Sequence, residues 1–165
     1  MEYNEAKSQF INAWGNLGTS WGINKAMAQI HALLLLSTEP QSAEDIMAAL
    51  QISRGNANMN LRALMDWGIV TKVSKSGERR EYFITGKDVW ELARQVSKER
   101  RRREIAPILK VLEDVQQVTG DNKKAVTEFK KVTKDLSDFT GKVDGLIEKF
   151  AKSDQSWFYK LLMKL

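Results

Sequence analysis

The sequence contains no cysteine, a single histidine and only two prolines among its 165 residues. Without cysteine there is no disulfide framework, no thiolate nucleophile and no cysteine-based zinc site. One histidine excludes metal sites of the HExxH type and leaves little for serine–histidine catalysis. There is also no phosphate-binding loop, since the glycine pair Gly15 and Gly18 lacks the strand-then-helix setting of a nucleotide site. We therefore expect no enzyme, no metal and no cofactor.

Long hydrophobic stretches are missing too. The leucine run from Leu33 to Leu36 is far shorter than the roughly 20 apolar residues that span a membrane. The first five residues lack the basic region and the apolar core of a signal peptide. We expect a soluble cytoplasmic protein without a membrane partner.

The charge is positive and unevenly distributed. The formal net charge is +5, and residues 87–165 carry that excess, because residues 1–86 are balanced. Within the balanced part, residues 51–80 nevertheless hold six basic side chains against two acidic ones. A further basic cluster comprises Arg94, Lys98 and the run Arg100 to Arg103, of which at most two face one partner on a helix. Such clusters attract a polyanion, although solvated helix faces are the alternative.

Two helices are predicted before Pro40. Residues 3–17 are amphipathic, with one face formed by Phe10, Ile11, Trp14 and Leu17. Gly15, Gly18 and Gly22 should weaken the end of this helix and mark a break. Asn24 is a suitable N-cap for a second helix that runs to about Thr38. This second helix is apolar nearly all round and should be buried.

A tight helix pair follows Pro40. Ser42 and Asp45 resemble a capping box for a short helix. Ser53 is a good N-cap for a helix that runs to Trp67, and Gly68 stands where a left-handed residue would end it. Residues 69–75 and 81–85 are β-branched strand candidates joined by a glycine-containing loop. Two helices at a tight turn, followed by a hairpin with a basic tip, predict a winged helix-turn-helix.

The helix that begins after Ser53 would be the DNA recognition helix, lying in the major groove. Its apolar stripe is Ala57, Leu61, Leu64 and Met65, and its candidate recognition residues are Ser53, Arg54, Gly55, Asn56, Asn58, Met59, Asn60 and Arg62. Asparagine disfavours helix interiors, so three of them suit contacts to adenine or to phosphate. Glycine at position 55 would allow close approach to the backbone of DNA. A solvent-facing polar helix is the alternative.

The hairpin loop would be the wing, with Lys75, Gly77, Arg79 and Arg80 as candidate DNA contacts. There the two arginines would bind phosphate or enter a narrow minor groove. The alternative is an ordinary solvated turn.

The remainder is helical. One helix covers residues 88–104, and Pro107 must kink or restart it, because proline has no N–H to donate. After a turn at 120–122, a heptad seam lies along the last long helix, formed by Phe129, Val132, Leu136, Phe139, Val143, Leu146 and Phe150. The seam packs either within one chain or across a homodimer. The amphipathic end, from Trp157 to Leu165, should dock on the body or on a partner.

At these residues a resemblance emerges. Residues 52–70 and 77–83 resemble the GbsR-like branch of the MarR-type bacterial transcriptional regulators, and residues 21–34 are similar to the helix that precedes this unit there. Met59 departs from the broader MarR pattern, in which arginine or another polar residue is common. The resemblance implies a mainly α fold with a small β-hairpin, in which a winged helix-turn-helix is flanked by N- and C-terminal helices that form a homodimer.

The resemblance also implies a function, namely sequence-specific binding of double-stranded DNA to control transcription, tuned by a small-molecule effector. Some relatives respond to choline-like compounds, and Trp14, Trp21 and Trp90 are the candidate aromatic cage for such a cation. Core packing is the interpretation we favour for these tryptophans, and for His31 a core or interface role rather than a sensor of pH or ligand.

The expected domains are an N-terminal helix at 1–23 that contributes to the frame and the dimer, a winged helix-turn-helix DNA-binding domain at 24–86, and a helical dimerisation and regulatory region at 87–165. The alternative function is a winged-helix protein-interaction module with a coiled-coil-like partner helix.

Overall fold

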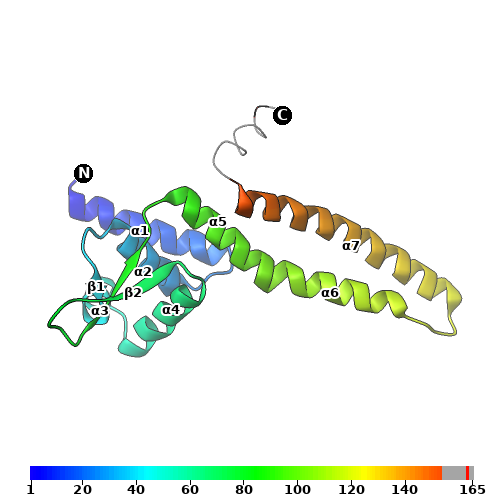
Figure 1. The fold of residues 1–165 in the computed structure, drawn as a ribbon, viewed down its shortest axis with the longest axis horizontal. Helices are drawn as coiled ribbons and strands as arrows, with labels where there is room; N and C mark the ends of the chain where they lie inside the picture. The colour runs from blue at the N-terminus through cyan, green and yellow to red at the C-terminus, as the bar shows by residue number, and fades with distance from the viewer. Residues whose placement is uncertain (154–162, 164–165) are drawn as a thin grey trace. The chain divides into compact units, whose positions relative to one another are not determined.

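The computed structural model describes residues 1–153 and Met163. It forms two compact units, Met1–Leu92 and Ala93–Leu165, called here the first and the second unit (Figure 1). The expected amphipathic end from Trp157 to Leu165 lies outside the described residues, apart from Met163.

The first unit begins with helices α1 (Tyr3–Ser20) and α2 (Lys25–Leu36). Asn24 caps α2 as predicted, because its Oδ1 accepts the backbone N–H groups of Ala26 and Met27. The buried residues of α2 are Met27, Ala28, Ile30, His31, Ala32, Leu33 and Leu34. With so much of its surface covered, α2 is the central helix of the unit, as its all-round apolar pattern predicted.

The expectation that Gly15 and Gly18 interrupt α1 is wrong. The helix continues to Ser20, and both glycines are buried where α1 packs on α2. A Cβ atom at Gly18 would lie 2.5 Å from the Cβ of Ala28, so the absence of a side chain permits the close approach. This rotates the buried face of α1 toward the glycines, and Leu17, expected on that face, is 41% exposed. The break comes at Gly22, with φ +74°.

The helix pair and the hairpin form as predicted. They comprise α3 (Ala43–Leu50), α4 (Arg54–Asp66), β2 (Val70–Ser74) and β3 (Glu81–Thr85). Ser42 and Asp45 form the capping box, and Gly68 adopts the left-handed conformation with φ +66°.

A third strand was not predicted. β1 (Gln41–Ser42) pairs antiparallel with β3, giving the strand order β1-β3-β2. Two polar residues directly after a proline carry no strand pattern, so the sequence offered no signal for it.

One core joins these elements. Its buried members are Ile11, Met27, Ile30, Ala32, Leu33, Leu34, Ile46, Leu61, Leu64, Val70 and Phe83. They come from α1, α2, α3, α4, β2 and β3, so the helices and the small sheet pack around α2. This is the mainly α fold with a small β-hairpin that the sequence predicted for a winged helix-turn-helix, and β1 extends the hairpin to a three-stranded sheet.

The helix α5 (Val89–Arg100) continues without a break through a π-helical turn, Arg101–Ile105, into α6 (Ala106–Asp114). The prediction was a kink or a restart at Pro107, and the structure instead has a widened turn immediately before it. The N–H of Ala106 donates to the carbonyl of Arg101, five residues earlier, which suits a chain approaching a proline that lacks a donor.

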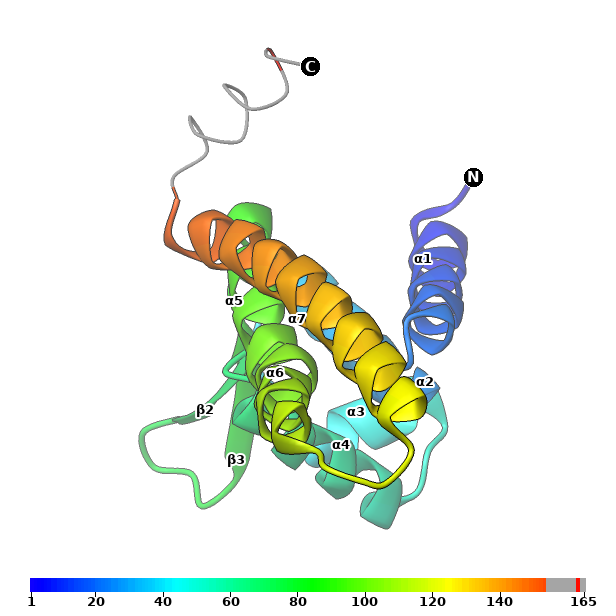
Figure 2. The ribbon, with the colours of Figure 1, turned by 90° about the vertical axis from the view of Figure 1, so that its right-hand side faces the viewer.

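In the second unit α6 packs beside α7 (Lys123–Lys152), after a short 3₁₀ turn at Val115–Gln117 (Figure 2). Of the described residues in this unit, Leu112 and Glu99 are the buried ones. The described part of this unit therefore has almost no hydrophobic core of its own. Among the described helices, none has the length and apolar character needed to cross a membrane.

The close α1–α2 contact generates a first prediction. The variant Gly18→Ala should lower the free energy of unfolding by about 1–3 kcal/mol, because its methyl group overpacks against Ala28. Urea denaturation measures the change. Gly55→Ala is the matched control, since nothing lies within 4 Å of a Cβ there, and it should be neutral or stabilising by about 0.5 kcal/mol. A stabilised Gly18→Ala protein would contradict the packing described.

Candidate nucleic-acid interface

Helix α4 presents a polar face to solvent because its opposite face is held in the core. Ala57, Leu61 and Leu64 are buried, which fixes the rotation of the helix. The Ser53 Oγ accepts the backbone N–H of Asn56 at 3.3 Å and caps the helix start. The exposed predicted recognition residues are Ser53, Arg54, Gly55, Asn58, Met59 and Arg62, and Asn56 is half-buried. Most of the predicted recognition set therefore lies on one accessible surface.

Asn60 is the exception in that set. Its side chain is only 2% exposed, and its Nδ2 donates to the backbone carbonyl and to the Oδ1 of Asn56. In this conformation Asn60 has no surface with which to touch DNA, contrary to the expectation that it lies with the contacting residues. The spacing of four residues from Asn56 was the signal that the two side chains meet.

The wing is the loop between β2 and β3, and two of its side chains contact Tyr82 of β3. Gly77 adopts φ +81°, a conformation that favours glycine. The Nζ of Lys75 lies 4.3 Å above the ring of Tyr82, and the Tyr82 hydroxyl donates to the carboxylate of Glu78. That hydrogen bond to Glu78 raises the pKa of Tyr82. Sequence reasoning assigned this role to neither Tyr82 nor Glu78.

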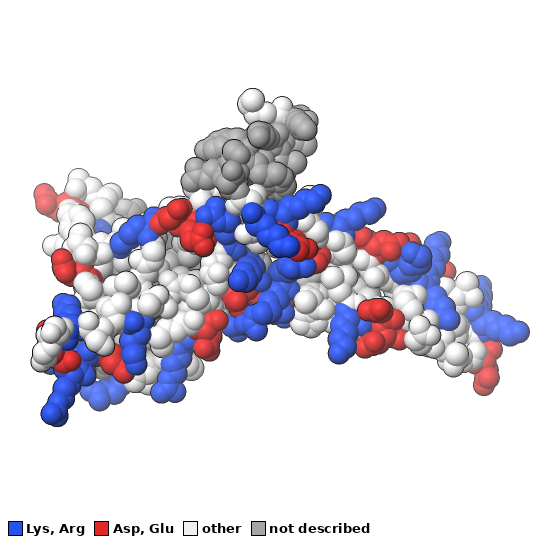
Figure 3. All heavy atoms as spheres, in the orientation of Figure 1, with Lys and Arg blue, Asp and Glu red and all other residues white. Residues whose placement is uncertain are grey.

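The arginines of the first unit are available to a polyanion. Arg79 and Arg80 are exposed in the wing, and Arg54 is exposed at the start of α4. In the part of the chain that the structure describes, no hydrogen bond or ion pair engages these three guanidinium groups. Figure 3 shows Lys and Arg side chains along the lower edge of the first unit, over the wing and α4. This edge therefore carries exposed basic side chains, three of whose guanidinium groups have no ion-pair partner among the described residues.

The arginine run of the second unit is arranged differently. Arg101 makes paired hydrogen bonds to Asp144, with Nε to Oδ1 at 2.6 Å and Nη2 to Oδ2 at 2.9 Å. Arg102 and Arg103 both donate to the carboxylate of Glu99. The hydrogen bond from Arg102 is the main reason that the pKa of Glu99 lies below its usual range. Arg101 is thus paired with a carboxylate of α7, whereas Arg102 and Arg103 share the single charge of Glu99 on their own helical segment. This pairing makes the run less available to an external anion.

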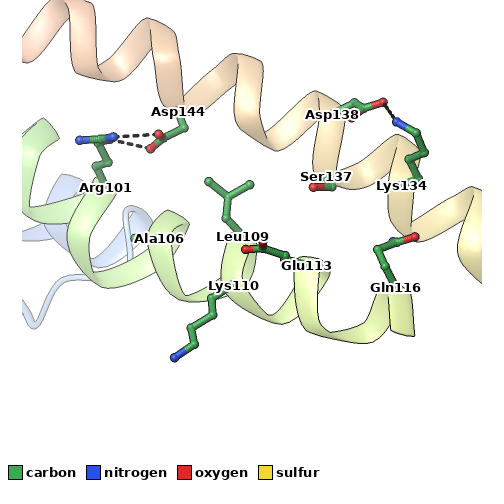
Figure 4. Close-up of a pocket in the computed structure, with 10 residues that line it drawn as sticks. All are labelled: Arg101, Ala106, Leu109, Lys110, Glu113, Gln116, Lys134, Ser137, Asp138 and Asp144. Atoms are coloured by element: carbon green, nitrogen blue, oxygen red, sulfur yellow. Dashed lines mark hydrogen bonds and ion pairs between the residues drawn. The ribbon is translucent and has the colours of Figure 1, made fainter. Parts of the chain in front are cut away.

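A groove of about 730 Å³ lies between α6 and α7 (Figure 4). Two ion pairs flank it, Arg101 with Asp144 and Lys134 with Asp138, and the side chain of Leu109 points into it. Four of its charged lining residues are thus paired with one another. Across residues 1–153, no cluster of three or more His, Asp or Glu side chains is placed to hold a metal ion.

The three candidate cage tryptophans sit in different surroundings. Trp14 is half-buried, stacked on Phe10 with ring centroids 5.5 Å apart, and its ring lies 6.3 Å from that of His31. Trp21, at the end of α1, is 59% exposed, and Trp90 belongs to α5. Trp14 therefore serves core packing, the interpretation favoured for it from the sequence.

Known proteins similar to this chain share the winged-helix part. Residues 21–81 match the model of the MarR family. The HTH-type transcriptional regulator MmpR5 of Mycobacterium tuberculosis is 29% identical over 76 residues, which are 46% of this chain and 46% of that protein. The chain thus aligns with about half the length of this curated relative. Over the helix pair and the wing, the chain is similar to MarR-type winged-helix regulators.

A solved structure extends the likeness in fold. It is described as the crystal structure of a transcriptional regulator, and its chain superposes with a TM-score of 0.57 at 19% sequence identity. The superposition covers 87% of this chain and 99% of that one. At this identity the likeness concerns the fold, which includes helices outside the winged helix.

His31 is a buried titratable group in the first unit. It is 6% exposed, and its Nε2 is the one buried side-chain polar atom without a hydrogen bond among the described residues. Burial, with a further contribution from the charge of Lys87, lowers the pKa of His31 to about 4. The folded state therefore favours the neutral imidazole.

This burial predicts a pH dependence of stability. Between the unfolded pKa of about 6.5 and the folded pKa of about 4, the unfolded chain binds the proton more tightly. The contribution of His31 is thus complete above pH 6.5 and is lost as the pH falls toward 4, by on the order of 3 kcal/mol. Urea unfolding across this range measures it. His31→Leu should remove this part of the slope, and an unchanged slope would contradict the assignment.

Proposed function

We propose that this protein is a sequence-specific regulator of transcription that binds double-stranded DNA, of the MarR type and its GbsR-like branch. The observation that carries the proposal is the exposed polar face of α4 next to a wing whose arginines make no ion pair in the described chain. A helix of this kind fits the major groove, with its N-terminal residues at the base edges. The matched family model and the curated relative, itself an HTH-type transcriptional regulator, support it.

The contacts divide by chemistry. Arg54, Arg62 and the Ser53 hydroxyl are donors that suit phosphate oxygens. Asn56 and Asn58 carry amides, which pair with the N6 and N7 edge of adenine. The wing residues Lys75, Gly77, Arg79 and Arg80 lie along the backbone or in the minor groove. Phosphate contacts then supply affinity, and the amides supply sequence preference.

We propose that the working form is a homodimer assembled through the second unit. Its described residues bury little apolar surface, while the seam on α7 is open, with Phe129 43%, Val132 47%, Leu136 49%, Phe139 66% and Leu146 55% exposed. The seam's two other members, Val143 and Phe150, are half-buried. A face this apolar requires a partner, and a second copy provides the same heptad pattern. Two winged helices would then contact half-sites about one helical turn apart in a pseudo-palindrome.

The same proposal divides the chain by role. Residues 1–23 support the frame and the dimer, 24–86 bind DNA, and 87–165 hold the dimer together and regulate it. A protein with a chromosomal target acts in the bacterial cytoplasm. A small-molecule effector that tunes it would have the exposed indole of Trp21 as an aromatic contact, with Trp90 as a further candidate.

A gel-shift assay with genomic fragments in moderate salt tests the function. Retarded fragments that share a pseudo-palindromic sequence support the regulator. Absence of any retarded fragment would contradict it and favour a winged-helix module for binding other proteins, for which the exposed α7 seam would be the partner surface.

Substitutions in α4 and in the wing should have different effects. Asn56→Ala should weaken binding to the preferred sequence by about 1–3 kcal/mol and leave binding to random DNA nearly unchanged, because it removes base contacts. Arg80→Ala should weaken binding to both and reduce the salt slope by about 0.9 for each phosphate that the side chain neutralises in the wild-type complex. Fluorescence anisotropy titrations on both DNAs at several salt concentrations measure these effects. Equal losses on both DNAs for both variants would refute this division.

Dimerisation has its own test. Phe139→Glu places a charge in the centre of the exposed seam and should convert a dimer into a monomer in sedimentation analysis. Gly141→Glu is the control, since it adds the same charge to α7 at an exposed position off the seam and should remain dimeric. A wild-type monomer, or dissociation of both variants alike, would overturn the assignment of the seam.

A further inference from the structure

Near its middle, α4 buries an asparagine, a residue type that is unfavourable in such a position. Asn60 is 2% exposed, next to the buried residues Ala57, Leu61 and Leu64. Asparagine is a poor helix former, and a buried amide is costly unless it is hydrogen-bonded. An alanine or a leucine would suit the position better on packing grounds alone. The bonds of this amide therefore indicate what it does.

Those bonds are directed at a single residue. The Nδ2 of Asn60 donates to the Asn56 backbone carbonyl at 2.9 Å and to the Asn56 Oδ1 at 2.6 Å. The second bond decides the orientation of the Asn56 amide, because only an oxygen accepts from Nδ2. The Oδ1 of Asn56 is held on the side of Asn60, and its Nδ2 is turned away from Asn60.

Asn56 itself is half-buried in the first turn of α4. Its backbone N–H donates to the Ser53 Oγ at 3.3 Å, which fixes the backbone from which the amide projects. A free amide exchanges its donor and acceptor by rotating about its last torsion, and so matches more than one base edge. A fixed amide offers one pattern and loses little entropy on binding.

We propose that Asn60 is a positioning residue for DNA sequence recognition, which fixes the Asn56 amide so that its Nδ2 donates to the N7 of a purine in the major groove. This rests on the proposed function, because it takes α4 as the helix that enters the groove. Both purines present N7 as an acceptor there. The class of ligand recognised by the Asn60–Asn56 pair is thus a purine base edge.

Selection of preferred sequences from a random duplex library tests the pair. Wild type should prefer a purine at one position of each half-site, and Asn56→Ala should lose that preference. Asn60→Ala should lose the purine preference at the same position, with discrimination between purine and pyrimidine reduced about tenfold. The double variant, with alanine at both 56 and 60, should lose no more of this discrimination than Asn56→Ala alone. Asn16→Ala is the matched control, an exposed asparagine on α1 outside the candidate interface, and should retain it. Asn60→Leu keeps volume without a donor and serves if the alanine variant fails to fold.

A second measurement needs no variant. Replacing the selected purine by its 7-deaza analogue removes N7 and leaves the Watson–Crick edge intact, and it should weaken wild-type binding by about tenfold. Insensitivity of every purine in the site to this replacement would overturn the proposal. So would Asn60 variants that weaken binding to all sequences equally, since that is the signature of a structural role. A wild-type protein that selects no sequence would instead refute the proposed function itself.

Discussion

Burial of α2 is the constraint on which the first unit depends. This helix supplies Ile30, Leu33 and Leu34 to the centre of the core, and α1, α3, α4 and β3 all pack against it. Because α4 must bury Leu61 and Leu64 toward this core, its polar side has to face solvent. The orientation of the candidate DNA-binding face is therefore a consequence of hydrophobic packing on the opposite side of the same helix.

The same residue type serves two purposes in the two units. Arg79 and Arg80 stand in a turn stiffened by the Tyr82–Glu78 hydrogen bond, and no ion pair holds them in the described chain. Arg101 instead makes a bidentate pair of hydrogen bonds to Asp144 within the second unit. Net charge alone would assign more anion binding to the second unit, whereas local pairing makes its arginine run less available.

Helix ends and helix faces could be predicted from the sequence, because each depends on residues within one short segment. Side chains at Asn24, Ser42 and Ser53 cap the helices that they were expected to begin, and Gly68 ends α4 with a positive φ. Caps and turns depend on a residue's own backbone, so they were predictable. The apolar stripe of α4 was predictable for a similar reason, since helical periodicity is a property of a single segment.

Features that depend on two distant segments were not predictable. The burial of Gly18 depends on Ala28 in the next helix, and β1 exists only because β3 lies beside it. The candidate site shows the same limit. Asn60 was grouped with the contacting residues, and the packing of α4 on the core buries it instead.

The π-helical turn at Arg101–Ile105 has a consequence for how the second unit tolerates changes in chain length. One extra residue in a helical turn rotates everything that follows by about 100°. The direction in which α6 points Leu109, toward α7, depends on this added residue. Removing one residue from the turn would restore a regular helix and rotate Leu109 away from α7, so a single-codon deletion here would be far more damaging than most point substitutions in the same segment.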